Sequence, residues 1–168
     1  YIYIYKNDNL LQRAFFVSRI RGVVNGDEQK LILTDSQFEP TSDSFIDSYL
    51  EEKLYNKSDG KLVSISRTPN SISIKIDCAS EQFLIVSDTF YNDGWSASLN
   101  GKDIDILKVN GVFRGFHIPP GIDQLLEMKF IPNDILYGNV ISLLAMMFIF
   151  MLLFFNGYIF KRFGPLEW

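Results

Sequence analysis

Residues 95–107, WSASLNGKDIDIL, have the pattern of a β-hairpin. Two short strand-like runs flank Asn100-Gly101, and both turn residues accept the positive φ angles that a type I′ turn requires. A second Asn-Gly pair follows at Asn110-Gly111. The stretch therefore predicts antiparallel strands at 95–99 and 103–107, joined by a two-residue turn.

Strand signals continue on both sides of this hairpin. The run 62–66 and the run 72–76 alternate apolar and polar residues across a Thr68-Pro69-Asn70 turn, which predicts two half-buried antiparallel strands. Phe83-Leu84-Ile85-Val86 is continuously apolar, as in a central strand covered on both faces. Further strands are predicted at 1–5, 10–20, 112–118 and 125–131. Because turn signals separate these short strands, the sequence predicts an antiparallel β-sandwich or jelly-roll-like domain.

One short helix is predicted before the clearest strands. Asn25 followed by Glu28 has the form of a capping box, and Leu31, Ile32 and Phe38 are spaced to face inward. Pro40 ends the segment. The polar stretch 41–60 fits a strand or a short helix followed by a turn.

The segment 135–160 differs from everything before it. Its 26 residues include no charged side chain, and as a helix they would be roughly 39 Å long. Tyrosines lie near both ends, where amphipathic rings prefer a membrane interface. The alternative is a buried core helix, which a domain of this size could not surround. We expect a single C-terminal transmembrane helix.

The flanks of this segment predict its orientation. Lys161 and Arg162 follow it directly, whereas Asp134 precedes it, and positive residues favour the cytoplasmic side. We therefore expect an extracytoplasmic β-sandwich domain at 1–134, a transmembrane helix at 135–160 and a cytoplasmic tail at 161–168. The chain begins Tyr1-Ile2 with a predicted strand and no initiator Met, so we interpret it as a fragment of a longer chain.

Composition excludes several classes of protein. Residues 1–134 contain 14 basic and 19 acidic residues, a net charge of −5, so the basic face of a nucleic-acid-binding protein is missing. Cys78 is the only cysteine, which excludes an intrachain disulfide and suggests a small buried side chain in a strand. With His117 as the only histidine, no metal-ligand cluster or catalytic triad can be assembled, and we expect no metal and no cofactor. His117 itself is predicted to be half exposed on a strand.

Two loops concentrate aromatic and polar residues, at 87–95 and at 110–115. Aromatic rings can stack on the C–H faces of a sugar while polar groups bind its hydroxyls. The candidate glycan contacts are Asp88, Tyr91, Trp95, Asn110 and Arg114. The alternative, which we favour on the sequence, is that Tyr91 and Trp95 pack in the sandwich and Arg114 pairs with a carboxylate.

Carboxylates also occur in pairs. Asp103 and Asp105 lie on one face of a predicted strand, and Asp88 and Asp93 share a loop. Such pairs invite a comparison with glycosidases. Acidic residues on the outer face of a strand are usually solvated, however, so we expect no catalytic residue among them.

An ordered series of motifs resembles the C-terminal end of the YfhO-type bacterial membrane protein family. The motifs are FLIVSDTFY (83–91), GWSA (94–97), NGK (100–102), VNGVFRG (109–115), IPPG (118–121) and GNVIS (138–142), and RAFFV (13–17) resembles the strand that begins that domain. The family's common Tyr-Pro-Gly-Trp turn is replaced here by Tyr91-Asn92-Asp93-Gly94-Trp95, which is one residue longer and lacks the proline.

The resemblance implies a parent protein similar to GT-C-type glycosyltransferases, which transfer sugar from polyprenyl-phosphate donors to cell-envelope polymers. Their catalytic carboxylate lies in an early extracytoplasmic loop, so this region is expected to be non-catalytic. Its expected partners are the lipid bilayer, the upstream membrane domain of the same parent, and an envelope glycan or lipid-linked sugar. The alternative is a membrane-anchored carbohydrate-binding or structural module with no enzyme attached.

Overall fold

The computed structural model describes residues 10–91 and 93–163, with side chains described as far as Phe155. It divides into two compact units, Tyr1–Phe130 and Ile131–Trp168. The first unit contains the described strands and a short helix, and the second contains one long helix. The chain is mainly β with a C-terminal apolar helix, as the sequence predicts.

The elements follow one another in this order along the chain: β1 (Ala14–Phe16), β2 (Arg19–Gly22), α1 (Gly26–Thr34), β3 (Asp43–Ile46), β4 (Lys53–Leu54), the 3-10 turn η1 (Lys57–Asp59), β5 (Gly60–Thr68), β6 (Ser71–Cys78), β7 (Gln82–Val86), β8 (Trp95–Leu99), β9 (Lys102–Ile104), β10 (Leu107–Val109), β11 (Phe113–Ile118), β12 (Gly121–Phe130) and α2 (Asn133–Phe163).

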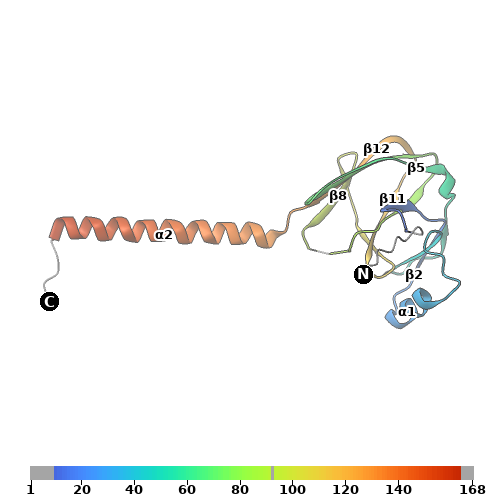
Figure 1. Ribbon diagram of the computed structural model, residues 1–168, viewed down its shortest axis with the longest axis horizontal. Coiled ribbons are helices and arrows are strands. Elements are labelled where there is room, and N and C mark those ends of the chain that lie inside the picture. Colours follow the sequence, from blue (N-terminus) through green and yellow to red (C-terminus); the bar gives the residue numbers. More distant parts are fainter. Residues whose placement is uncertain (1–9, 92, 164–168) are drawn as a thin grey trace, which may run out of the picture. The chain divides into compact units, whose positions relative to one another are not determined.

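The described strands form two sheets. The five-stranded sheet has the order β5-β6-β12-β8-β9, and the seven-stranded sheet has the order β1-β7-β11-β10-β3-β2-β4. In Figure 1, β5, β8 and β12 of the first sheet lie on one side of the domain, and β2 and β11 of the second lie on the other. Side chains from both sheets share one buried core, so the predicted β-sandwich is confirmed.

Strand β7 is covered on both faces, as its continuous apolar run predicts. Phe83, Leu84, Ile85 and Val86 are each 0–3% exposed. Since successive side chains of a strand point to opposite faces, the run supplies two cores. Leu84 and Val86 join the cluster between the sheets, and Phe83 and Ile85 join a second cluster on the other face.

The single strand predicted at 10–20 is wrong, because the structure splits it into β1 and β2. Only Val17 and Ser18 separate these strands, yet β1 forms one edge of the seven-stranded sheet and β2 lies beside the strand at the opposite edge. The sheet must therefore curl until its edges approach each other. The Val17 amide donates to the Phe83 carbonyl at 3.2 Å, and the Ser18 amide donates to the Ser42 carbonyl at 2.8 Å. Both Val17 and Phe83 belong to the second core cluster.

The Asn-Gly turns are confirmed by their backbone angles. Asn100 and Gly101 have φ of 52° and 79°, and Asn110 and Gly111 have φ of 48° and 75°. The strand predicted after the first turn is shorter than expected. Strand β9 ends at Ile104 in the five-stranded sheet, and the chain enters the seven-stranded sheet at β10. The segment 105–106 therefore connects the two sheets.

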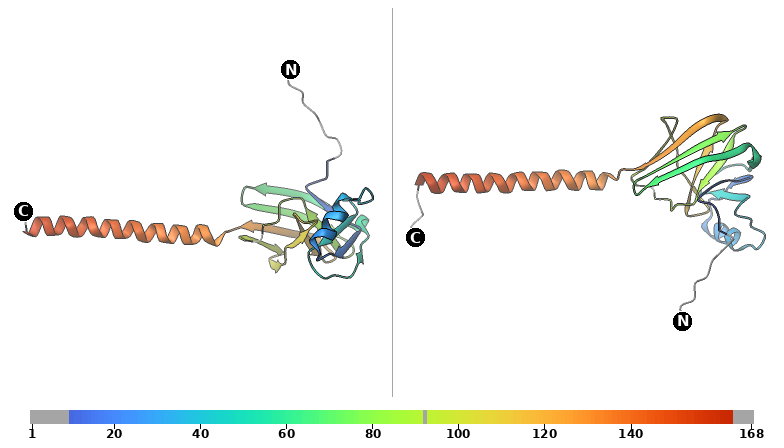
Figure 2. Two further views of the ribbon diagram at one scale, coloured as in Figure 1. Left: turned by 90° about the horizontal axis from the view of Figure 1, so that it is seen from below. Right: turned by 45° about the horizontal axis from the view of Figure 1, so that its top comes forward.

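Helix α1 begins where the sequence predicts, because the Asn25 side chain accepts a hydrogen bond from the Asp27 amide at 2.9 Å. The expected inward face is wrong in part. Leu31 is 70% exposed, whereas Ile32 and Phe38 are partly buried. The helix is held to the domain by Gln29, whose side-chain amide donates to the Val23 carbonyl at 2.6 Å. In the right-hand view of Figure 2 the blue α1 lies on the side of the domain away from the green and orange five-stranded sheet.

The remaining strand predictions hold with shifted ends, but the strand predicted at 62–66 is not half-buried. Ile65 is 45% exposed, because β5 is the edge strand of the five-stranded sheet. The predicted pair at 62–66 and 72–76 is the antiparallel pair β5 and β6. The last strand is longer than predicted, since β12 starts at Gly121 immediately after the two prolines and pairs there with Cys78. The strand predicted at 1–5 lies outside the described residues. His117 lies on β11 with 40% of its side chain exposed, as predicted.

The second unit is helix α2. Its segment Asn133–Phe155 is long and apolar enough to cross a membrane, and none of this span is buried within the chain. Among the described residues, this is the one helix with the length and apolar composition of a membrane span. A helix that is apolar along its length and none of whose described span is buried fits lipid surroundings, so the buried-core alternative has no support.

Candidate functional site

Most of the candidate residues lie at one end of the sandwich, where β12 leaves the domain. The loop after β7 connects the seven-stranded sheet to β8 of the other sheet, so it closes this end. Trp95, the first residue of β8, is paired with Phe130, the last residue of β12. Their rings lie 5.2 Å apart between centroids. We call this end of the domain the exit end.

Arg114 lies at the exit end and joins the two sheets. It lies on β11, and its guanidinium carbon is 3.9 Å from the centroid of the Trp95 ring on β8. Its Nε and Nη2 donate to the Thr89 carbonyl at 3.1 and 2.8 Å. The residue is only 4% exposed, and this burial lowers the pKa of the guanidinium, while the Asp88 carboxylate nearby raises it. A cation stacked on an indole and bonded to a loop carbonyl holds the loop against the sheet.

Asp88 is the anionic centre of the exit end. Its Oδ1 lies 3.4 Å from Nη1 of Arg13 and 3.1 Å from Nη1 of Arg67. The Asp88 side chain is 13% exposed, whereas those of Arg13 and Arg67 are 69% and 47% exposed. Two guanidiniums therefore share one carboxylate. The sequence did not suggest the two additional arginines, because they come from distant segments.

Tyr91 and Trp95 line a groove of about 540 Å³. The groove is also lined by Asp103 of β9 and by Asp105 of the segment that connects the sheets. Tyr91 is 55% exposed, and its ring packs edge-on against Phe130 at 6.5 Å. The groove thus combines exposed aromatic surface with carboxylate oxygens, which can accept hydrogen bonds from hydroxyl groups.

Asn110 does not line the groove, and its side chain is hydrogen-bonded elsewhere. It is 5% exposed, and its Oδ1 accepts a hydrogen bond from the Phe45 amide at 3.0 Å. Its Nδ2 donates to the Ser44 hydroxyl at 3.4 Å. These bonds tie the β10–β11 turn to β3, so in this structure Asn110 supports the turn, and it does not line the groove.

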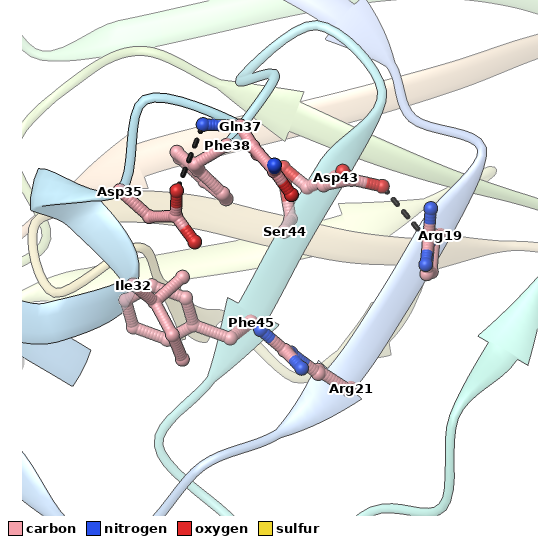
Figure 3. A pocket seen from close by; sticks show the side chains of 9 residues that line it. All are labelled: Arg19, Arg21, Ile32, Asp35, Gln37, Phe38, Asp43, Ser44 and Phe45. Atoms are coloured by element: carbon pink, nitrogen blue, oxygen red, sulfur yellow. Dashed lines mark hydrogen bonds and ion pairs between the residues drawn. The ribbon is translucent and has the colours of Figure 1, made fainter. Parts of the chain in front are cut away.

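A second cleft, of about 270 Å³, lies between the α1 region and strands β2 and β3 (Figure 3). Arg19 and Asp43 face each other across neighbouring strands with 2.9 Å between Nε and Oδ1. The Asp35 side chain accepts a hydrogen bond from the Gln37 amide at 2.9 Å. The side chains of Arg19, Asp43 and Asp35 thus bind groups of the protein itself. We interpret these contacts as holding the loop after α1 in place.

The described residues contain no group of three or more His, Cys, Asp and Glu side chains that could hold a metal ion. Cys78 is 3% exposed in the core between the sheets, and burial raises the pKa of its thiol to about 11. A thiol that is protonated and covered in this way is a packing group.

The comparison with protein families decides where the chain belongs. The family described as bacterial membrane protein YfhO matches residues 23–142, from the end of β2 to the first turns of α2. The chain belongs to the YfhO family. Searches of curated proteins and of solved structures returned no match.

Membership of the YfhO family confirms the resemblance that the motifs suggested. The matched region includes the exit-end loop, both Asn-Gly turns and the beginning of α2. The family consists of bacterial membrane proteins, and α2 has the length and composition of a membrane span. The chain is therefore associated with a membrane.

Proposed function

We propose that this chain is a non-catalytic, extracytoplasmic β domain with the last membrane span of a polytopic YfhO-family protein, and that the domain contacts an envelope glycan. The parent is proposed to resemble glycosyltransferases that use polyprenyl-phosphate sugars. The observation that carries the proposal is the groove that Tyr91, Trp95, Asp103 and Asp105 line together.

The chemistry of the groove suits a sugar. The C–H faces of a pyranose ring stack on aromatic side chains, while its hydroxyls donate hydrogen bonds to carboxylates. The Trp95 ring contacts the Arg114 guanidinium and the ring of Phe130 on the neighbouring strand β12. Its orientation is therefore fixed before a ligand binds. A preordered ring loses little conformational entropy on binding, which favours weak but specific contacts.

Catalysis is not part of the proposal. Glycoside hydrolysis needs two carboxyl groups on opposite sides of the bond that is broken. Asp103 and Asp105 are two residues apart in the chain, and among the described residues that line the groove they are the only carboxylates. We therefore assign them to hydroxyl binding and expect transfer chemistry to come from the upstream membrane domain.

The proposed orientation rests on charge. Lys161 and Arg162 follow the apolar part of α2, and Asp134 precedes it, so the positive end is expected in the cytoplasm. To test this, Ile122→Cys and Trp168→Cys are labelled in intact cells with a membrane-impermeant maleimide. Labelling of Ile122→Cys alone is expected. Labelling of Trp168→Cys alone would show that the orientation is opposite to the one proposed.

Glycan contact is tested on the whole chain in nanodiscs. The chain has two tryptophans, so in a Trp168→Phe background the indole N–H signal and the fluorescence report on Trp95. Glucose, galactose and N-acetylglucosamine oligosaccharides are added to millimolar concentrations. We expect a shift of the Trp95 signal that is lost in Tyr91→Ala and weakened in Asp105→Asn. Tyr49→Ala is the matched control, because Tyr49 is 91% exposed and does not line the groove.

Absence of any shift with all three sugars would remove the glycan role and leave the groove structural. The accessory role has a separate test, which is deletion of residues 1–134 from the full-length parent. Unchanged envelope glycosylation at normal protein level would contradict it. If the gene encodes no further apolar span upstream, the alternative of a membrane-anchored binding or structural module takes its place.

A further inference from the structure

The exit end has an exposed surface that the glycan groove does not use. It consists of Arg13, Arg67 and Val112, and we call it the exit rim. The two arginine side chains are 69% and 47% exposed, and Val112 is 52% exposed. Neither arginine nor Val112 lines the groove.

Strand register and hydrogen bonds locate the rim at the end of β12. Arg67 on β5 pairs with Ile72 on β6, which pairs with Met128 near the end of β12. Arg13 is joined to Arg67 through Asp88. The Val112 carbonyl accepts a hydrogen bond from the Phe90 amide at 2.6 Å, in the loop that ends at Trp95. All three rim residues therefore belong to the end from which the chain leaves for α2.

The covalent chain keeps this end near the membrane span. Only Ile131 and Pro132 separate Phe130 from Asn133, where α2 begins. Consecutive Cα atoms are 3.8 Å apart, so the Cα atoms of Phe130 and Asn133 are at most about 11 Å from each other. The opposite end of β12, at Ile122, is roughly 26 Å from Phe130 along the strand.

The charge of the rim is opposite to that of the domain. Residues 1–134 carry a net charge of −5, but in the rim two exposed guanidiniums, those of Arg13 and Arg67, share the single carboxylate of Asp88. Guanidiniums bind phosphate oxygens with a planar, two-donor geometry. An exposed aliphatic group at the same end of the domain, Val112, suits the boundary between headgroups and acyl chains.

We propose that the exit rim binds the phosphate groups of anionic phospholipids in the bilayer that α2 enters. Asp88 holds Arg13 and Arg67 side by side, and their exposed guanidiniums contact the headgroups. Val112 lies at the interface. This contact would orient the β domain, and with it the groove, over the membrane surface. It does not depend on glycan binding.

The test uses the whole chain reconstituted through α2 into vesicles, with an environment-sensitive fluorophore on Val112→Cys. Cys78 does not compete for the maleimide at neutral pH, because it is buried and its thiol pKa is about 11. Ile122→Cys is the matched control, an 82% exposed aliphatic position at the other end of β12. The vesicles contain phosphatidylcholine, with or without phosphatidylglycerol, and a lipid with a nitroxide at headgroup depth.

We expect the label at 112 to be quenched and blue-shifted in phosphatidylglycerol vesicles, and less so in high salt, while the label at 122 is unaffected. Neutralising one rim arginine should reduce the ratio of docked to undocked domain about fivefold. Arg13→Gln with Arg67→Gln is compared with Lys61→Gln and Lys102→Gln, two exposed lysines outside the rim.

Equal quenching at 112 and 122, or quenching at 112 that ignores phosphatidylglycerol and salt, would overturn the proposal. The lipid comparison needs no arginine variant, so it decides even if the double variant fails to fold. Sugar titrations have no bearing on this readout. The lipid contact and the glycan groove can therefore fail separately.

Discussion

Two apolar runs in this chain, β7 and the first part of α2, consist of similar residues in opposite surroundings. Phe83 to Val86 in β7 are 0–3% exposed because protein covers both faces of the strand. From Asn133 to Phe155, every side chain of α2 is exposed. Neither run alternates with polar residues, so periodicity alone does not separate them. Length does, since a strand of five residues can be enclosed by two sheets, whereas a span of 23 residues needs lipid.

The largest effect that would test this comparison is expected for Phe83→Ala. Phe83 is fully buried, its ring centroid is 4.9 Å from that of His117, and it packs against Tyr55. Loss of the ring should lower the free energy of unfolding of the β domain by about 3 to 5 kcal/mol. Urea unfolding of the whole chain in micelles, followed through Trp95 in a Trp168→Phe background, measures this change.

Phe148→Ala in α2 is the matched control for Phe83→Ala. Phe148 is 60% exposed and makes no contribution to the β core. It should leave the unfolding of the domain unchanged. A similar loss in both variants would mean that the two apolar runs share one protein environment, contrary to the comparison.

The second effect concerns membrane insertion. Leu144→Arg puts a charge near the middle of the span, where insertion scales give a cost of about 2.5 to 3.5 kcal/mol. We expect a smaller fraction of the chain to resist carbonate extraction from membranes, while Leu144→Ile behaves like the parent sequence. Full membrane retention of Leu144→Arg at unchanged protein level would show that α2 does not face lipid there.

The smallest effect is a pH dependence from His117, which lies beside Phe83 and Tyr55 of the second core cluster. Burial lowers the pKa of His117, and the positive charge of Lys53 lowers it further, while Glu81 opposes this shift. A histidine with a lower pKa in the folded state takes up its proton more readily when unfolded. The free energy of unfolding should therefore decrease as the pH falls from above 6.5 to the folded-state pKa.

The readout for His117 is the difference between the parent and His117→Gln, because other acidic groups titrate in both. Lys53→Gln should make the pH dependence shallower, since it removes a charge that disfavours protonation. With 40% of the side chain exposed, the effect is small. An identical pH dependence in the parent and His117→Gln would exclude any contribution from His117.

The parts of the fold that depend on local energies were predictable. Positive φ at Asn100-Gly101 and Asn110-Gly111, the cap at Asn25 and the uncharged length of α2 each depend on a few neighbouring residues. Local signals also found the exit-end loop, with Asp88, Tyr91 and Trp95. They could not find the break between β1 and β2, because Val17-Ser18 is not one of the residue pairs that mark a turn. The strand is interrupted there because β1 pairs with β7, whereas β2 pairs with β3 and β4.

Which residues gather at the exit end was harder to predict from the sequence than the position of the loop at 87–95. Arg13 and Arg67 lie 75 and 21 residues from Asp88 in the sequence, and only the pairing of β1 with β7 and of β5 with β6 brings them together. Asp105 lines the groove together with Tyr91 and Trp95 where the chain leaves β9 at Ile104 and crosses to β10 in the other sheet. Asn110, a candidate on the sequence, instead bonds to β3.

By itself the sequence determined the class of the protein: short antiparallel strands, tight turns, a C-terminal helix long and apolar enough to span a membrane, and membership of the YfhO family. The tertiary structure decided which strands pair, how the seven-stranded sheet curls, and which charged and aromatic side chains meet at the exit end. The physical reason is the range of the interactions. Turn geometry and hydrophobic length are set by neighbours in the chain, whereas strand order depends on how distant apolar faces pack against each other.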